Sequence, residues 1–239
     1  MFSRRRADSG DGADLRKNLV TLSEPYKPAS EAYRTLRTNL LYSAVDKPDQ
    51  AIVITSSGPN EGKTTTCANL GVVLAQAGKK CVILDCDLRK PSIHSIFELR
   101  NIWGVVDVIV GQRDLPDVWQ EPMEKLAVVT SGSIPPNPTE MLGSKGFAKL
   151  LAESRQTFDY VLIDAPPVEL FADAAILTKQ ADGAVIVLDA RSTRKASLRN
   201  SLRSLGTVDA TVLGTVMNNV KLSESSYYYS YAYQADSDQ

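Results

Sequence analysis

SSGPNEGKTTT, residues 56–66, is the stretch that decides the fold of this chain. An apolar strand-like run, residues 51–55, precedes it, and a helix-forming stretch, residues 63–78, follows and ends at Gly78. A strand, a glycine-containing loop with Lys and Thr, and a helix in this order are typical of a phosphate-binding loop. The backbone amides of such a loop and the N-terminus of its helix attract phosphate. The segment therefore predicts nucleotide binding.

The side chains of this loop have distinct expected roles. Lys63 is expected to reach the β- and γ-phosphates, and Thr64 to place its hydroxyl on Mg²⁺. Thr65 is a candidate contact of the α-phosphate. The usual motif begins with glycine, whereas Ser57 stands there in this chain, followed by Gly58. The other loop residues expected to line the nucleotide are Asn60, Glu61 and Gly62. A plain glycine turn followed by a lysine is the alternative, and the flanking strand and helix argue against it.

Outward from the loop, apolar runs alternate with helical patterns. Five further runs read as strands: 81–85, 126–130, 160–164, 183–190 and 211–217. Near-continuous Val, Ile and Leu runs separated by helices indicate a parallel sheet that is covered on both faces. The fold class expected is α/β, a P-loop NTPase-like three-layer sandwich with a mainly parallel central sheet. The dinucleotide fingerprint G-x-G-x-x-G is missing from the sequence, which argues against a Rossmann oxidoreductase.

Composition divides the chain into three parts. Residues 1–27 are polar and are expected to form a flexible N-terminal segment. Residues 28–220 are expected to form one P-loop domain, which includes a helix at 29–44. Residues 221–239 have no apolar period and are expected to be a flexible, tyrosine-rich tail. With 43% hydrophobic residues, the chain can build one sizeable core.

The overall charge and the cysteines exclude several classes of protein. The formal net charge is −1, which argues against a nucleic-acid binder, since such proteins usually carry a basic excess. No apolar run approaches the roughly 18–20 residues of a membrane helix. The three cysteines, Cys67, Cys81 and Cys86, lie in apolar segments without metal-ligand spacing. Buried thiols in a reducing, cytoplasmic compartment are expected.

Acidic residues mark two predicted strand ends. Asp85 ends one strand, Asp87 lies two residues further, and Asp164 ends another strand. Ligands of parallel sheets bind at the carboxyl ends of the strands. We therefore expect the three carboxylates to converge near Lys63 and Thr64, where carboxylate and hydroxyl oxygens suit Mg²⁺. A strand-end turn or a helix cap would explain one such carboxylate, but it explains three beside a phosphate loop less well.

These segments resemble the bacterial tyrosine kinases (BY-kinases), in particular the stand-alone cytoplasmic type of capsule and exopolysaccharide synthesis. The stretches SSGPNEGKT, VILDCDLRKP and VLIDAPP match the family's Walker A, A′ and B segments, and TSGSIPPNPTEML resembles its stretch between A′ and B. The likeness covers roughly residues 20–220. It implies an ATP- and Mg²⁺-dependent transfer from ATP to protein tyrosine that gives ADP and phosphotyrosine, and thereby regulates polysaccharide synthesis and export.

The resemblance also implies roles for single residues. The catalytic set that it implies is Lys63, Asp85, Asp87 and Asp164. Thr64, Asp85 and Asp164 would hold the metal. One of Asp85 and Asp87 would accept or orient the tyrosine hydroxyl proton, and the sequence does not decide which. Asn218 would read adenine, although an ordinary turn asparagine explains that position equally well.

The family's oligomerisation motif, E-x-x-R-x-x-R, corresponds to Glu31, Arg34 and Arg37. At about 100° per residue these side chains share one helix face. Taken alone, they would be an ordinary solvated face with one ion pair. Beside the kinase segments, they favour a subunit interface, and the resemblance implies a ring-shaped homo-oligomer.

The C-terminal tail carries five of the nine tyrosines, and its flanks are polar. The predicted phosphoacceptors are Tyr227, Tyr228, Tyr229, Tyr231 and Tyr233. The resemblance further implies a transmembrane polysaccharide co-polymerase as activator, a cognate tyrosine phosphatase, and a peripheral location at the inner face of the membrane through that activator. An aromatic tail that merely adheres to a partner is the alternative.

Two other functions remain open at this point. A partition or septum-placement ATPase of the same broad fold would carry a signature lysine five residues before the loop lysine, where this chain has Gly58. A nucleotide-binding adaptor without kinase activity is the second. The partition ATPase also leaves the cluster of tyrosines at the C-terminus unexplained.

Overall fold

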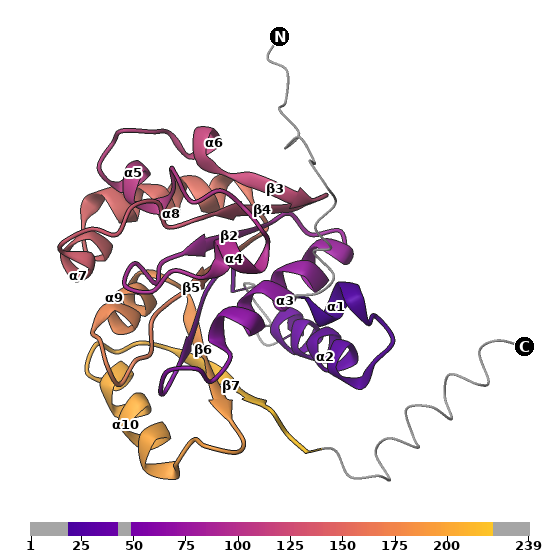
Figure 1. Ribbon diagram of the computed structural model, residues 1–239. Helices are drawn as coiled ribbons and strands as arrows, with labels where there is room; N and C mark the ends of the chain where they lie inside the picture. The colour runs from indigo at the N-terminus through magenta and orange to yellow at the C-terminus, as the bar shows by residue number, and fades with distance from the viewer. Residues whose placement is uncertain (1–18, 43–48, 222–239) are drawn as a thin grey trace, which may run out of the picture.

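The computed structural model describes residues 19–42 and 49–221 (Figure 1). Its centre is a seven-stranded sheet with the order β3-β4-β2-β5-β1-β6-β7. The strands are β1 (Ala51–Ser56), β2 (Cys81–Asp85), β3 (Gln120–Met123), β4 (Leu126–Val129), β5 (Tyr160–Asp164), β6 (Gly183–Asp189) and β7 (Val212–Asn218). All neighbouring strands pair in parallel except β3 and β4. The expected α/β fold with a mainly parallel sheet is therefore confirmed.

Helices cover both faces of this sheet (Figure 1). They are α1 (Val20–Ser23), α2 (Pro28–Tyr42), α3 (Lys63–Gln76), α4 (Ile93–Ile96), α5 (Val105–Ile109), α6 (Leu115–Val118), α7 (Pro138–Leu142), α8 (Lys145–Thr157), α9 (Asp173–Gln180) and α10 (Lys195–Gly206). Because strand side chains alternate between faces, β1 contributes Ile52 and Ile54 to one core and Val53 to the other. The first core lies against α1 to α4, and the second against α5 to α10.

The antiparallel strand β3 lies at one edge of the sheet and was not expected from the sequence. Its residues, QEPM, have no apolar run, and they include Pro122. A proline has no N–H to donate, so it is tolerated in an edge strand and not in a central one. The pairing with β4 is irregular, since the register shifts between Gln120 and Met123.

The structure differs from the expectation of a flexible segment over residues 1–27. Leu19 and Thr21 are fully buried, and α1 packs on α2 and α3. The backbone N–H and the hydroxyl of Thr21 both donate to Asn69 Oδ1 of α3, at 3.1 and 2.8 Å. The four residues of α1 are too few to show a helical period, and their order comes from these tertiary contacts. Residues 1–18 lie outside the described part of the chain.

Two further expectations concern the interior and the membrane. Cys67, Cys81 and Cys86 are free and buried, as expected. Among the residues that the structure describes, no helix combines the length and the apolar character needed to cross a bilayer.

Candidate functional site

The phosphate loop connects β1 to α3 at the carboxyl edge of the sheet. Gly62 immediately precedes α3 with φ of 94°, a left-handed conformation that favours glycine. The backbone angle favours glycine here, and a Cβ on Gly62 would lie 2.1 Å from Asn218 Nδ2, so the Asn218 side chain would have to move. The first turn of α3 starts from Gly62. The backbone amide groups of this first turn have no hydrogen-bond partners within the helix. The loop thus presents backbone donors at the sheet edge.

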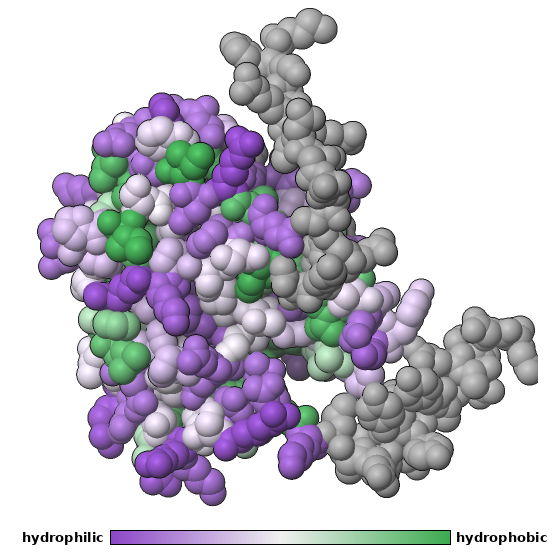
Figure 2. Space-filling view, viewed as in Figure 1, coloured by the Kyte–Doolittle hydropathy of each residue, from purple (hydrophilic) through white to green (hydrophobic). Residues whose placement is uncertain are grey.

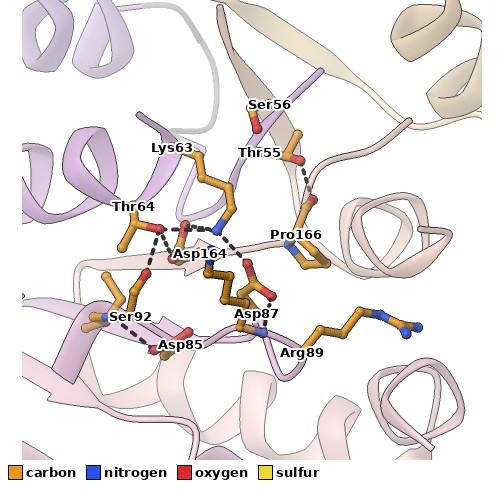
Figure 3. Close-up of polar contacts among 12 residues, drawn as sticks. Thr55, Ser56, Lys63, Thr64, Asp85, Asp87, Arg89, Ser92, Asp164 and Pro166 are labelled. Atoms are coloured by element: carbon orange, nitrogen blue, oxygen red, sulfur yellow. Dashed lines mark hydrogen bonds and ion pairs between the residues drawn. The ribbon is translucent and has the colours of Figure 1, made fainter. Parts of the chain in front are cut away.

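Lys63 lies among acidic side chains (Figure 3). Its Nζ is 2.7 Å from Asp87 Oδ2, 3.5 Å from Asp164 Oδ1 and 3.1 Å from Thr64 Oγ1. Burial alone would lower the pKa of Lys63, but the charges of Asp164 and Asp87 outweigh burial and raise this pKa to about 12. Lys63 therefore keeps its positive charge at every physiological pH.

Asp85 and Asp164 face each other as register partners on β2 and β5. Both are fully buried. Thr64 Oγ1 donates to Asp164 Oδ2 at 2.8 Å, and the Ile93 backbone N–H donates to Asp85 Oδ2 at 3.1 Å. Burial raises the pKa of both carboxyl groups, and the neighbouring Asp164 raises that of Asp85 further, to well above its ordinary value.

The donor atoms here suit Mg²⁺. Oδ1 of Asp85 and Oδ1 of Asp164 are buried and accept no hydrogen bond. Together with the hydroxyl of Thr64, these atoms are hard oxygen ligands, the type that Mg²⁺ takes. Residues 19–42 and 49–221 contain no group of three or more His, Cys, Asp or Glu that could hold a metal by itself. A Mg²⁺ ion at this place would therefore complete its coordination shell with water and phosphate oxygens, as Mg²⁺ usually does in proteins.

Two predicted loop residues hold the loop in place through their side chains. Ser57, which replaces the usual glycine, accepts a hydrogen bond from Ser201 Oγ of α10 at 2.9 Å. The buried carboxylate of Glu61 accepts from the Gly58 N–H at 3.0 Å and also from the Thr193 hydroxyl. Sequence reasoning missed Thr193 and Ser201, because each lies more than a hundred residues from its partner and forms no motif with it.

The remaining nucleotide candidates lie around the same loop. Asn218 ends β7, and its Nδ2 donates to the Glu61 carbonyl oxygen at 3.2 Å. Thr65 is exposed in the first turn of α3, and Asn60 is exposed with φ of 61°. The structure thus brings all of these residues to one rim of the site, while their contacts with nucleotide stay predictions.

Arg89 is held away from Lys63 by a second polar cluster. Its guanidinium donates to Asp173 through Nε at 2.8 Å and through Nη2 at 3.3 Å, and to Thr139 Oγ1 at 2.9 Å. Thr139 Oγ1 in turn donates to Asp173 Oδ1 at 2.6 Å, and Arg89 lies 4.1 Å above the centre of the Phe171 ring. These contacts fasten the loop after β2 to α7 and α9.

The three residues of the predicted oligomerisation motif do not act alike. Arg34 Nη1 forms an i,i+3 ion pair with Glu31 Oε2 at 2.6 Å, and the Glu31 side chain is 67% exposed. Arg37 Nη1 instead donates to the Val73 carbonyl oxygen of α3 at 3.2 Å. Arg37 therefore has a role within its own subunit, and an interface through Glu31 and Arg34 stays a prediction.

The predicted phosphoacceptors lie outside the described residues. The set is Tyr227, Tyr228, Tyr229, Tyr231 and Tyr233. The described chain ends at Lys221, three residues after β7, so the acceptor role stays a prediction from sequence.

Comparison with known proteins places the chain among defined relatives. Residues 50–213 match a family model described as an AAA domain. The tyrosine-protein kinase YwqD of Bacillus subtilis is 42% identical over 218 residues, which are 91% of this chain and 92% of the relative. The tyrosine-protein kinase wzc of Salmonella typhimurium is 31% identical over 224 residues, which are 92% of this chain and 31% of the relative. A crystal structure of the chimerical protein CapA2B2 superposes with a TM-score of 0.82 at 36% identity, covering 86% of this chain and 91% of the other.

Proposed function

This chain belongs to the bacterial tyrosine kinases, and we propose on that basis that it transfers the γ-phosphoryl group of ATP to the tyrosines of its own C-terminal tail. The products would be ADP and protein phosphotyrosine. The observation that carries the proposal is the cluster of Lys63, Thr64, Asp85 and Asp164 beside the phosphate loop. Phosphoryl transfer asks a protein mainly to position the reactants and to stabilise charge, and this cluster has groups for both tasks.

Each member of the cluster has a task that its contacts support. Lys63 keeps its charge and would turn from Asp87 and Asp164 toward the phosphates. Thr64, Asp85 and Asp164 would hold Mg²⁺, which when bound neutralises charge on the phosphate oxygens. One of Asp85 and Asp87 would accept or orient the tyrosine proton. The two differ in their bonds, since Asp87 pairs with Lys63 whereas Asp85 accepts from the Ile93 N–H.

The kinase is proposed to work with a transmembrane activator of polysaccharide synthesis. The match covers 31% of the relative wzc, so a longer chain can contain a region like this one. For this chain, a separate membrane protein would take the place of the regions that wzc has beyond the matched part. That protein would hold the kinase at the inner face of the membrane. A ring of subunits that joins through Glu31 and Arg34, and a phosphatase that resets the tail, complete the proposal.

The deciding experiment is a phosphotyrosine assay on the purified full chain with Mg-ATP and the cytoplasmic tail of the activator. We expect phosphotyrosine in wild type, and a loss of at least about a hundredfold in Lys63→Met. Lys79→Met, which changes an exposed lysine just beyond α3, should match wild type. Replacement of all five tail tyrosines by phenylalanine should remove the signal from the chain itself.

Other results would assign the protein differently. Phosphate release without phosphotyrosine, in the presence of the activator, would contradict the kinase proposal and favour a partition-type ATPase. Nucleotide binding with neither product would favour an adaptor. Full phosphotyrosine in the five-fold phenylalanine variant would place the acceptors elsewhere in the chain.

A further inference from the structure

The segment from residue 190 to residue 206, here called the basic segment, comprises the loop after β6 and helix α10. It has five basic residues and no acidic residue, although the whole chain has a net charge of −1. The five are Arg191, Arg194, Lys195, Arg199 and Arg203, and all are exposed. Within residues 19–42 and 49–221, none of the five forms an ion pair. The basic segment therefore presents an excess of positive charge to solvent, with Asp189 beside Arg191 at its start.

Part of this charge is arranged as a stripe along α10. Lys195, Arg199 and Arg203 are spaced four residues apart, so they lie above one another on one side of the helix. At 1.5 Å per residue the stripe is about 12 Å long. Ser201 and Leu205 on the inner side are buried, which fixes the orientation of the helix. In Figure 2, hydrophilic side chains gather over the region of α10 at the lower edge of the molecule.

The C-terminal tail leaves the fold beside the start of the basic segment. The Ala190 N–H donates to the Asn218 carbonyl oxygen at 2.9 Å, and Asn219 Nδ2 donates to Asp189 Oδ2 at 3.0 Å. Figure 1 shows the loop from β6 to α10 passing close to the end of β7. Residues 222–239 contain three acidic residues, no basic residue and five tyrosines, so their charge is opposite to that of the basic segment.

We propose that the basic segment is the docking surface for the phosphorylated form of residues 222–239, an inference that rests on the proposed tail phosphorylation. Each phosphate adds roughly −1.5 to −2 charge and three acceptor oxygens. Arginine guanidinium groups bind phosphate with two parallel hydrogen bonds. The seven residues from Lys221 to Tyr227 span up to roughly 20 Å when extended, which exceeds the length of the stripe. The tail can therefore bring its phosphates onto α10 without unfolding any part of the domain.

Docking would remove tyrosines that are already phosphorylated from the catalytic sites. It would also place them on a helix that touches the phosphate loop, because Ser201 of α10 bonds Ser57. An unphosphorylated tail has fewer charges and would dock weakly, which leaves its tyrosines available. The same surface thus distinguishes the product of the reaction from its substrate by charge.

The test uses the full chain with the five tail tyrosines replaced by phenylalanine, so that its own tail carries no phosphate. Synthetic peptides of residues 221–239, one unphosphorylated and one with five phosphotyrosines, are labelled and added in trans. Binding is measured by fluorescence anisotropy at physiological ionic strength. We expect the phosphopeptide to bind about tenfold more tightly or better, and the double change Arg199→Gln and Arg203→Gln to remove most of this gain. The matched control is Lys145→Gln with Lys149→Gln, two exposed lysines four residues apart on α8.

Three outcomes overturn the proposal: equal affinity for both peptides, equal loss in the two double variants, or binding to anionic lipid vesicles that depends on Arg199 and Arg203 while the phosphopeptide does not bind. The last would assign the surface to the membrane. Because the peptide is phosphorylated chemically, its binding does not depend on catalysis by this chain. A negative docking result would therefore not contradict the kinase proposal. A negative kinase assay would likewise not affect the interpretation of the peptide-binding result.

Discussion

Asp85 and Asp164 are register partners on adjacent parallel strands, and both carboxyl groups are buried at the edge of the sheet where β1 gives way to the phosphate loop. Two like charges so close together, with one oxygen of each lacking a hydrogen bond, destabilise the ligand-free protein. Lys63 Nζ, 3.5 Å from Asp164 Oδ1, offsets part of this repulsion, and a bound metal ion would offset more of it. The buried pair of carboxyl groups therefore lowers the free energy of unfolding at the place where nucleotide and metal are proposed to bind.

Asp85→Asn should stabilise the ligand-free protein by about 1–2 kcal/mol at neutral pH, because the amide keeps the bond from Ile93 and removes a buried charge. Burial raises the folded-state pKa of Asp85 above its unfolded value of 3.8, so the folded state retains a proton that the unfolded state has lost. Its contribution to stability is complete below pH 3.8 and declines as the pH rises through the window between these two pKa values. Urea unfolding of both proteins at several pH values measures this, with exposed Asp117→Asn as control. A variant that is less stable than wild type at neutral pH would contradict the prediction.

Binding of Mg²⁺ with nucleotide should tighten as the pH rises. The raised pKa values of Asp85 and Asp164 mean that a proton must leave before a carboxylate can bind the metal. Affinity should increase by up to about tenfold per pH unit for each proton released. Titration calorimetry in buffers of different ionisation enthalpy counts these protons. Asp85→Asn should release fewer of them, and equal proton release in both proteins would show that Asp85 does not titrate on binding.

Arg89→Ala should lower the free energy of unfolding by about 2–3 kcal/mol, because it leaves the buried carboxylate of Asp173 without its cation. Asp173→Asn removes that charge, so the double variant should lose less than the sum of the single losses, with a coupling of about 1–2 kcal/mol. Chemical denaturation of the four proteins gives this cycle, and exposed Arg100→Ala serves as control. Additive losses would mean that the pair contributes nothing as a unit.

Thr21→Val should cost about 1–2 kcal/mol of stability, because it removes the hydroxyl that donates to Asn69 in a fully buried position. Thr38→Val on the exposed side of α2 changes the same groups and should stay within about 0.5 kcal/mol of wild type. Thermal or urea unfolding separates the two. If Thr21→Val behaved like Thr38→Val, the hydrogen bond from the Thr21 hydroxyl to Asn69 would not contribute to the stability of the domain.

Much of the sheet could be predicted from the sequence, since strands buried on both faces are continuous apolar runs. The bounds of β2 and β5 agree with the expected 81–85 and 160–164. Strand β3 was missed because its polar residues and Pro122 give no such run. Helix α1 was missed because it is short and depends on partners elsewhere in the fold.

The site was predictable where its geometry follows from topology. Parallel strands bring their carboxyl ends to one edge, so Asp85 and Asp164 had to approach the loop that begins after β1. The supporting contacts from Thr193 and Ser201 had no local signal, because a lone Ser or Thr in a helix or turn is common. Thr139 lies in the stretch TSGSIPPNPTEML, but nothing in that stretch indicated its bond to Arg89. The way in which whole helices and loops pack against one another, and not any short motif, places these three side chains.

The short strand β3 has a consequence for how copies of this protein can associate. When several copies of a protein come close together, an exposed edge strand can pair with the edge strand of another copy and extend the sheet without limit. Pro122 offers no N–H there, and the shifted register with β4 leaves a poor template for a further strand. Pairing of a further strand with β3 is therefore disfavoured, and the proposed ring would have to join its subunits at another part of the surface.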